Sequence, residues 1–492
     1  MRAGEKTWEL LQGKSLRAAV LILLGAGLSL VIASGNISNT AAALFGLVFV
    51  WVAFTRLKTG IFLAIVFANF QPFFERLLLL ASGGTFGGGA IWGNMFRTSV
   101  SLAILLLAAF AFGRKVVEKT RIFKFPLDKY IAVYLAWCLL QVFNPNQSTL
   151  IGIYGFKQEL VPLLMYFLAR DFFRTEEDLK FFFNYMIVYG TVSCGYALYQ
   201  HFFLTSFDQL WVTSVRGVFH ADIATGTGIR AFAFATGDMP FLFPLVAILI
   251  VVVALGRRFF NPWMRRTILL LYLCFALMTA FQLPRTPVLM LGLGLLVTSL
   301  LTGYIRGSLL KRLIFLGLAA IILVEAFVYF IPYLRDSKDP RFVRFAELAN
   351  PMEADTVKFR RERPWKESLA VISRHPLGIG VGSGKRTRPG VVAGTYYLPH
   401  NEFLMKWLEL GLPGLIFFIL LLLKTATVAA TVVWKGTQAW HRRYAAGILG
   451  VLAAYVACSM VNIPFLDESG IFFWFMAGVL PLIKGYEIAE TG

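Results

Sequence analysis

The chain has 492 residues, of which 58% are hydrophobic and only 15% are charged, and its mean hydropathy is +0.69. A water-soluble domain of this size cannot bury so much apolar surface, so the composition excludes a soluble protein and indicates that lipid surrounds most of the chain. The formal net charge of +20 therefore concerns membrane topology first, and we expect no nucleic-acid partner.

Apolar segments of membrane-spanning length recur along the chain. An α-helix needs roughly 17–25 apolar residues to cross the bilayer core. We predict about fourteen such helices, at 15–34, 40–55, 60–80, 97–113, 128–143, 153–170, 181–203, 239–255, 267–283, 286–302, 310–331, 411–433, 444–462 and 469–485. The first is too long for the apolar core of a signal peptide, so we expect an uncleaved helix. All four cysteines lie within these runs, which indicates helix packing rather than disulfides or a metal site.

The connectors between the predicted helices alternate in charge. The basic connectors are the N-terminus, Arg56/Lys58, 114–124, 170–180, 257–266, 304–312 and 434–443. The short connectors that hold no Lys or Arg are 34–38, 144–149 and 462–470. The positive-inside rule assigns the basic set to the cytoplasm. It thereby predicts a multi-pass protein with both termini in the cytoplasm and an even number of spans.

Two connectors on the outer side are long, 204–238 and 333–400. The second is the only segment large enough to fold outside the membrane, and it carries thirteen Lys or Arg against seven Asp or Glu. Long loops are translocated largely regardless of charge, so this loop does not contradict the topology. We therefore divide the chain into N-terminal membrane helices, a first outer loop, central membrane helices, a large outer loop and C-terminal membrane helices, at 1–203, 204–238, 239–332, 333–400 and 401–492.

Arginine and histidine side chains gather on the predicted outer side. Four of the five histidines fall there, and so do several arginines of the two long loops. Guanidinium groups bind phosphate oxygens in a bidentate manner, so this set predicts a pocket for an anionic lipid headgroup, above all a phosphate or diphosphate. Arg285 stands between Pro284 and Pro287 in a tight interruption between two spans, which favours a phosphate ligand. The alternative for each single arginine is a headgroup anchor or a solvated charge.

The segment PHNEF, 399–403, predicts a helix start at the outer interface. Asn401 is a good N-cap residue, and Glu402, Lys406 and Glu409 follow at helical spacing as one polar stripe on a half-wetted helix. His400 stands at the positive end of this helix, where a neutral imidazole can accept a proton. The alternative is a histidine that only caps the helix end.

Other sequence features carry less information about chemistry. Glu325 is the carboxylate that we place clearly at membrane depth, where it either holds one of the arginines or pairs with a neighbouring helix. The glycine-rich stretches 83–89 and 378–384 are predicted to be flexible turns, because nucleotide is absent outside the cytoplasm. The chain has no Walker loop, HExxH, EF-hand or CxxC motif.

Two stretches, RERPWKESLAVISRHPLGIGVGSG and PHNEFLMKWLELGLPGLIFFILLLL, resemble the shared region of the O-antigen ligase and Wzy-type polymerase superfamily. The family pattern Arg-x3-Trp, His-Pro-Leu-x-Gly-x-Gly and His-Asn-x-x-Leu falls on Arg361 with Trp365, on 375–382 and on His400 with Asn401. Two further arginines resemble family motifs more loosely: Arg285 lacks the usual flanking Ser and Gly, and Arg230 precedes Asp238 where Pro-Asn is expected. The resemblance covers about 230–425.

The resemblance implies an all-α polytopic membrane protein of the bacterial inner membrane, similar to GT-C glycosyltransferases, with about fourteen helices and a large, mainly helical periplasmic loop. It implies inverting, metal-independent glycosyl transfer from an undecaprenyl-diphosphate-linked glycan at the periplasmic face. Arg230 and Arg285 are then the candidates for the diphosphate and His400 for the general base, the three catalytic residues. Substrate contacts are expected from Arg361, His375, Arg216, Asn401 and Glu402, with His375 also serving as a reserve base or a turn residue. Neither a cofactor nor a metal is expected.

The acceptor separates the two closest alternatives. A Wzy-type polymerase transfers the glycan to another lipid-linked repeat, whereas an O-antigen ligase transfers it to the lipid A core. The length of the chain and its number of spans favour a polymerase. A lipid-linked oligosaccharide flippase is a third alternative and an envelope scaffold a fourth. Membrane lipids are expected partners in every case, and polysaccharide assembly proteins are candidate partners.

Overall fold

A computed structural model describes residues 46, 49–52, 55–81, 90–203, 205–209, 233–235, 238–282, 285–305, 330, 333, 362–384 and 399–483. These residues form helices and no strand, so the predicted all-α class is confirmed for them. Most of the two long outer loops lies outside the described residues, as do the chain ends that we expect in the cytoplasm.

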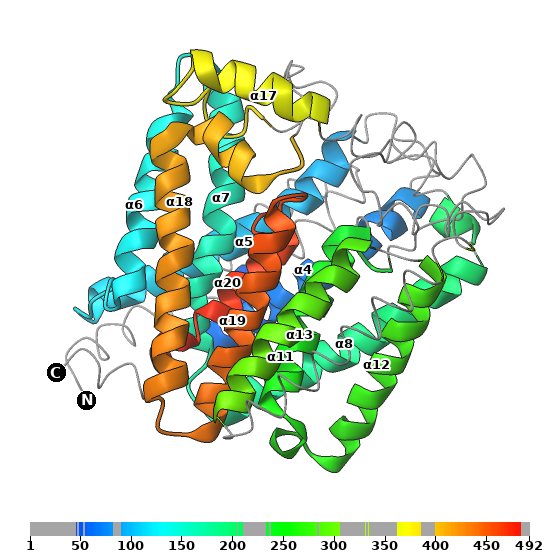
Figure 1. Ribbon diagram of the computed structural model, residues 1–492. Helices are drawn as coiled ribbons and strands as arrows, with labels where there is room; N and C mark the ends of the chain where they lie inside the picture. Colours follow the sequence, from blue (N-terminus) through cyan, green and yellow to red (C-terminus); the bar gives the residue numbers. More distant parts are fainter. Residues whose placement is uncertain are drawn as a thin grey trace.

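From 60–80 onwards, each predicted span that the structure describes overlaps a helix (Figure 1), and the predicted spans 15–34 and 310–331 lie outside the described residues apart from residue 330. The helices are α4 (Leu57–Ala81), α5 (Ala90–Val117), α6 (Pro126–Val142), α7 (Thr149–Phe172), α8 (Glu176–Phe202), α11 (Asp238–Leu255), α12 (Pro262–Gln282), α13 (Arg285–Ile305), α17 (Arg363–Arg374), α18 (Glu402–Lys435), α19 (Ala439–Ser459) and α20 (Asp467–Ala477). Short 3₁₀ turns occupy Arg257–Phe259 and Leu480–Leu482. Among the described residues, five helices are long and apolar enough to cross a membrane: α4, α5, α8, α13 and α18. The total of fourteen spans stays a prediction.

Local capping chemistry explains why several helices begin where they do. The Ser148 hydroxyl accepts a hydrogen bond from the backbone N–H of Ile151 and starts α7. At the start of α8, Thr175 and Asp178 form a reciprocal capping box, in which each side chain accepts from the other residue's backbone N–H. Such caps satisfy N–H groups that have no partner inside the helix.

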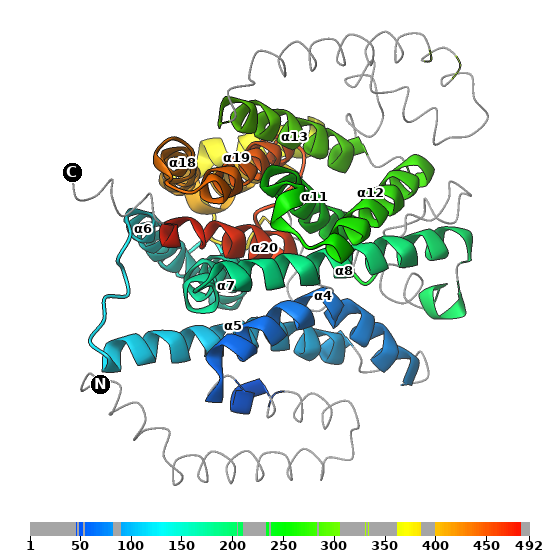
Figure 2. The same ribbon diagram turned by 90° about the horizontal axis from the view of Figure 1, so that it is seen from below.

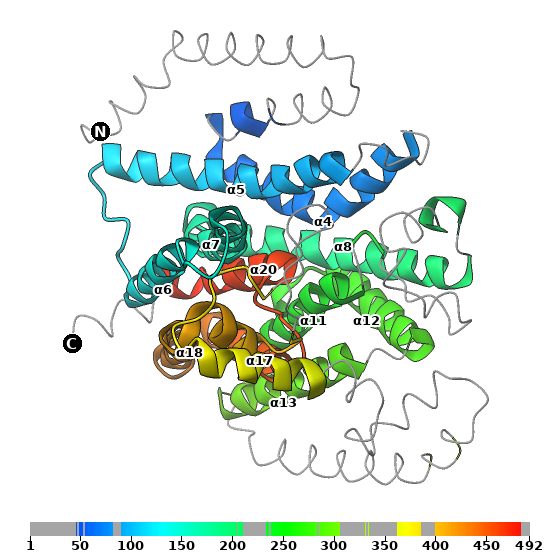
Figure 3. The same cartoon turned by 90° about the horizontal axis from the view of Figure 1, so that it is seen from above.

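The helices are arranged in layers, as seen from either end of the bundle (Figures 2 and 3). Helices α4 and α5 pack together along one side and cover α7. Helices α11, α13, α18 and α19 form the opposite side, where α19 packs against each of the other three. Helix α12 packs along α8. This arrangement leaves α20 between α7 and α11 in the middle of the bundle.

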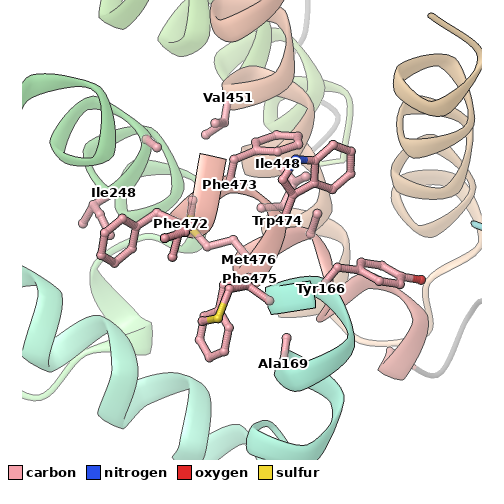
Figure 4. Close-up of a cluster of buried hydrophobic side chains, with 14 of the residues drawn as sticks. Tyr166, Ala169, Ile248, Ile448, Val451, Phe472, Phe473, Trp474, Phe475 and Met476 are labelled. Carbon is pink, nitrogen blue, oxygen red and sulfur yellow. The ribbon is translucent and has the colours of Figure 1, made fainter. Parts of the chain in front are cut away.

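Helix α20 forms much of the central core (Figure 4). Its residues Phe472, Phe473, Trp474, Phe475 and Met476 are consecutive, and each is at most 2% exposed. A helix that is apolar on every face must be surrounded by protein or by lipid, and here the other helices surround it. We predicted a span at 469–485, but the α-helix ends at residue 477 and is too short to span the bilayer core by itself.

The two ends of the bundle differ in charge, as the connectors predict. At one end the basic connectors contact each other: Lys58 pairs with Asp178, the ammonium of Lys180 lies 5.4 Å from the ring centroid of Phe259, and the rings of Phe259 and Trp440 are 6.1 Å apart. At the other end, neutral connectors contact the residues around 375–384 and 399–402. The charged and neutral connectors therefore lie on opposite sides of the bundle.

Candidate active site at the bend of α18

Helix α18 is divided by a sharp bend at Gly411. This residue has φ +69° and ψ −177°, a backbone conformation that is essentially limited to glycine. Pro413 has no N–H group, so it cannot donate the helical hydrogen bond to the carbonyl of Glu409. The part before the bend lies under α17 across the end of the bundle, and the part after it crosses the bundle (Figure 1).

The segment 375–384, which we call the glycine loop, fills the bend. The backbone N–H of Ile379 donates to the carbonyl of Leu408 at 3.0 Å, and the N–H of Gly380 donates to the carbonyl of Glu409 at 3.0 Å. Both carbonyls lose helical partners at the bend, and the loop supplies replacements. The glycine loop and α18 therefore form one folded unit.

The glycines of this loop are required by close packing. Gly378, Gly380 and Gly382 all have positive φ values, +90°, +105° and +90°, and all are buried. A Cβ atom on Gly382 would lie 2.7 Å from the Cα of Gly155 on α7. We predicted a flexible turn for 378–384, and that prediction is wrong, because the loop is wedged between helices with its backbone hydrogen-bonded.

Helix α6 and the neutral connector after it also hold the loop. Three side chains donate to backbone carbonyls of the bend and the glycine loop: Trp137 to Leu410 at 2.8 Å, Gln141 to Leu377 at 2.9 Å and Asn144 to Gly378 at 3.0 Å. The connector 144–149, predicted to lie on the outer side, and the His375 region are therefore at the same end of the bundle.

His400 has a strained backbone and an exposed position just before α18. Its φ is +47°, in the left-handed region that non-glycine residues seldom adopt. The preceding carbonyl, that of Pro399, accepts a 2.6 Å hydrogen bond from the indole N–H of Trp365 on α17. Conformations of this kind persist only where the surroundings fix them, and they cluster at functional sites.

Asn401 caps α18 as predicted. Its side-chain oxygen accepts from the backbone N–H of Leu404 at 2.9 Å, and its side-chain nitrogen donates to the carbonyl of Met460 at 3.2 Å. Asn401 is buried, with 7% exposure. The residue after His400 is thus fixed both to its own helix and to the end of α19.

The polar stripe of α18 faces the protein interior. Glu402, Lys406 and Glu409 are each 0% exposed, so the predicted half-wetted stripe is wrong. The carboxylate of Glu402 accepts from the backbone N–H of Phe465 at 3.1 Å and from the hydroxyl of Ser459 at 3.4 Å. The stripe is buried because the bend turns this part of α18 across the bundle.

Lys406 forms a buried ion pair with a residue that we did not single out from the sequence. Its ammonium group lies 2.6 and 2.7 Å from the two carboxylate oxygens of Glu159 on α7. Glu159 also accepts from the hydroxyl of Tyr134 on α6 at 2.9 Å. Because Glu159 is ten residues into α7, it lies about 15 Å from the start of that helix. Glu159 is therefore a carboxylate at depth that we missed in the sequence when we singled out Glu325.

A second buried ion pair lies at the base of the first long loop. The guanidinium of Arg76 on α4 contacts Asp208 at 3.1 Å and donates to the carbonyl of Ala233 at 2.6 Å. Arg76 and Asp208 are both 0% exposed in their side chains. Ala233 is three residues after Arg230, so this pair anchors the segment that leads from Arg230 to α11. A charged residue inside an apolar run of span length is the sequence signal that identifies both Arg76 and Glu159, although Glu75 and Lys157 accompany them.

The structure describes some of the other predicted site residues. Arg285 is the first residue of α13. Since α12 starts within the basic connector 257–266, the end of α12 and the start of α13 lie toward the opposite end of the bundle, where α18 also starts (Figure 1). His375 ends α17, and its carbonyl accepts from the N–H of Gly378 at 2.9 Å, which is a turn geometry. The predicted residues that lie outside the described part of the chain are Arg216, Arg230, Glu325 and Arg361.

Among the described residues, no group of three or more His, Cys, Asp or Glu side chains gathers in a way that could hold a metal ion. The four cysteines form no disulfide and lie within or beside the helix core.

Residues 270–419 match the family model Wzy_C, described as O-antigen ligase. Over these residues, which make up less than a third of the chain, the sequence is similar to the O-antigen ligase family. The match spans the start of α13, helix α17, the glycine loop and the bend of α18, so the resemblance seen in the sequence is confirmed for the segments that form the candidate site. No curated protein matches the chain. The family and the five apolar helices together indicate an integral inner-membrane protein with glycosyltransferase-type activity in O-antigen or related polysaccharide synthesis.

Proposed function

We propose that the protein is an inverting, metal-independent glycosyltransferase that polymerises an undecaprenyl-diphosphate-linked glycan at the periplasmic face. The observation that carries this proposal is the convergence at His400. Three segments of the family region meet there: Trp365 of α17 binds the carbonyl before His400, Asn401 caps α18, and the glycine loop fills the bend below. The result is an exposed imidazole whose backbone is held rigidly by these three segments.

The charge of the connectors supports a periplasmic site. Lys and Arg concentrate in connectors at one end of the bundle, and the positive-inside rule assigns that end to the cytoplasm. His400 precedes α18 at the other end, where Asn144 of the neutral connector contacts the glycine loop. A donor whose lipid lies in the outer leaflet would reach the site there.

The chemistry follows from the charges that change during transfer. The acceptor hydroxyl attacks the anomeric carbon of the donor sugar, a new glycosidic bond forms, and the bond to the lipid diphosphate breaks. His400 takes the proton of the hydroxyl, a role typically worth about 10²–10⁴ in rate. The diphosphate leaves with the electron pair. Arg230 and Arg285 stabilise its negative charge, and each such donor contributes about 2–4 kcal/mol.

Among the remaining predicted contacts, Arg361 and Arg216 would add positive charge near the diphosphate, as part of the proposal. Asn401 and Glu402 are buried and bonded within the protein. We therefore propose that these two residues hold His400 in place. His375 is proposed to shape the turn into the glycine loop, because its backbone closes that turn.

The O-antigen ligase activity is the second candidate function, favoured by the description of the matching family model. Deleting the gene distinguishes the two. Surface lipid A that carries single repeats indicates a polymerase, whereas undecorated lipid A with lipid-linked glycan of normal chain length indicates a ligase. The family match gives no support to a flippase, and an accumulation of donor on the cytoplasmic side would be the sign of one.

Complementation of the deletion strain tests the assigned residues. His400→Ala and Arg285→Ala should abolish surface glycan assembly, while the amount of protein in the membrane stays normal. The matched controls are His441→Ala and Arg258→Ala, at the end with the basic connectors, and both should complement. If His400→Ala complements fully, the assignment of the base is wrong.

A further inference from the structure

A cluster of charges is buried beneath His400. Lys406 pairs with both carboxylate oxygens of Glu159, and its ammonium lies 3.8 Å from Glu402 on the previous turn of α18. Tyr134 donates to Glu159 from α6. We call these four residues the Lys406 cluster, and it joins α6, α7 and the first part of α18.

Joining helices through buried charges, as this cluster does, costs desolvation free energy. Removing an ammonium and carboxylates from water carries a large desolvation penalty, and apolar side chains of similar volume often connect helices at least as stably. Charged side chains at membrane depth are rare and mark functional positions by default. The cluster is therefore better explained by a need for directional contacts than by stability.

The contacts of the cluster lead directly to His400. Glu402 is two residues after His400, and it also accepts hydrogen bonds from the backbone N–H of Phe465 and the hydroxyl of Ser459. Lys406 is one turn further along the same helix and fixes the rotation of that helix against α7 through two hydrogen bonds. A rotation of this first part of α18 would displace His400, which immediately precedes it and has a left-handed backbone conformation.

We propose that Lys406, paired with Glu159, is a positioning residue for glycosyl transfer, because it sets the rotation of the first part of α18 and thereby the place of the His400 imidazole. This inference rests on the proposed function, in which His400 is the base. Lys406 itself is 0% exposed, so it acts through His400 and not on the substrate.

The test compares Lys406→Met, Glu159→Gln and the double variant in purified, lipid-reconstituted protein. Each single variant leaves one buried charge without its main partner and should lower the melting temperature. The double variant removes both charges and should regain most of the melting temperature. Because a displacement of about 1 Å can slow an enzyme about a hundredfold, we expect kcat to fall roughly ten- to a hundredfold in all three variants. KM for the lipid-linked donor should stay within about threefold.

The milder variant Glu159→Asp keeps the charge but shortens the reach of the carboxylate. It should lower kcat with little change in melting temperature, so the proposal stays testable if a neutral variant does not fold. The matched control is Arg170→Met, which breaks a buried pair between α7 and Asp128 of α6 at the other end of the bundle. It should lower the melting temperature and leave kcat per folded molecule unchanged.

The outcomes separate this inference from the proposed function. Recovery of wild-type kcat in the double variant, or an unchanged kcat in Glu159→Asp, would show that the pair only stabilises the fold and would overturn the inference alone. Wild-type protein without transfer activity, or a fully active His400→Ala variant, would overturn the proposed function and this inference with it.

Discussion

Gly411→Ala is the most direct perturbation of the bend that organises the site. Alanine does not tolerate φ +69° with ψ −177°, and forcing it there costs about 1–3 kcal/mol. The added Cβ would also lie 2.3 Å from the carbonyl carbon and 2.6 Å from the Cα of Leu377. These are backbone atoms, which cannot rotate away, so the glycine loop would have to leave the bend.

The free energy that Gly411→Ala costs can be estimated from the contacts that hold the glycine loop. Leaving the bend breaks the backbone hydrogen bonds from Ile379, Gly380 and Leu412, at 3.0, 3.0 and 3.1 Å. At about 1 kcal/mol each, these bonds and the backbone strain together amount to roughly 4–6 kcal/mol. Because the transmembrane helices pack elsewhere, we expect local detachment of the loop rather than loss of the bundle. Transfer should then slow by about a hundredfold or more.

The assay combines transfer rate with limited proteolysis in lipid nanodiscs. Arg374 is exposed and immediately precedes the glycine loop, so detachment should speed tryptic cleavage after it. The matched control is Gly195→Ala, a helical position where an added Cβ meets nothing within 4 Å, and it should change neither readout. If Gly411→Ala keeps the wild-type rates of transfer and of cleavage, the glycine loop is not packed into the bend of α18 as the contacts indicate.

Three further variants test single contacts. Trp365→Phe removes the indole donor to the carbonyl of Pro399, a bond worth about 1 kcal/mol, and should slow transfer by about fivefold. An unchanged rate would show that this hydrogen bond does not position His400. Arg76→Met leaves Asp208 buried without its main partner, at a cost of about 3–5 kcal/mol, and should lower the melting temperature by several degrees; a stable variant would contradict the buried pair. Asn401→Ala should lose about 1 kcal/mol of capping energy together with the side-chain hydrogen bond to the carbonyl of Met460, which differential scanning fluorimetry detects as a lower melting temperature.

Much of the helical framework was predictable from hydropathy, because a helix in lipid must be apolar over the thickness of the bilayer. The start of α18 was also predictable, since the Asn401 cap is a local interaction within one turn. The length of α20 was not predictable, because an apolar segment reads alike whether lipid or protein surrounds it.

The parts of the site that depend on tertiary contacts were beyond the sequence pattern. The stripe of Glu402, Lys406 and Glu409 has the spacing of a solvated helix face, and only the bend at Gly411 turns it inward. Glu159, the partner of Lys406, is distant in the sequence, and no local sequence rule pairs Lys406 with Glu159. The glycine loop was predicted to be flexible because its tertiary contacts cannot be read from the sequence. Glycine with a positive φ occurs both in mobile turns and in tightly packed loops.

The central claim is that this protein transfers a glycan from a lipid diphosphate with His400 as the base. The most direct measurement incubates the purified protein with an undecaprenyl-diphosphate-linked glycan and an acceptor, and quantifies free undecaprenyl diphosphate together with the extended glycan. Wild-type protein should release one undecaprenyl diphosphate for each glycosidic bond that it forms, in the presence of a metal chelator, and His400→Ala should yield neither product. Equal product formation by the two proteins, or no lipid diphosphate release by the wild type, would contradict the claim.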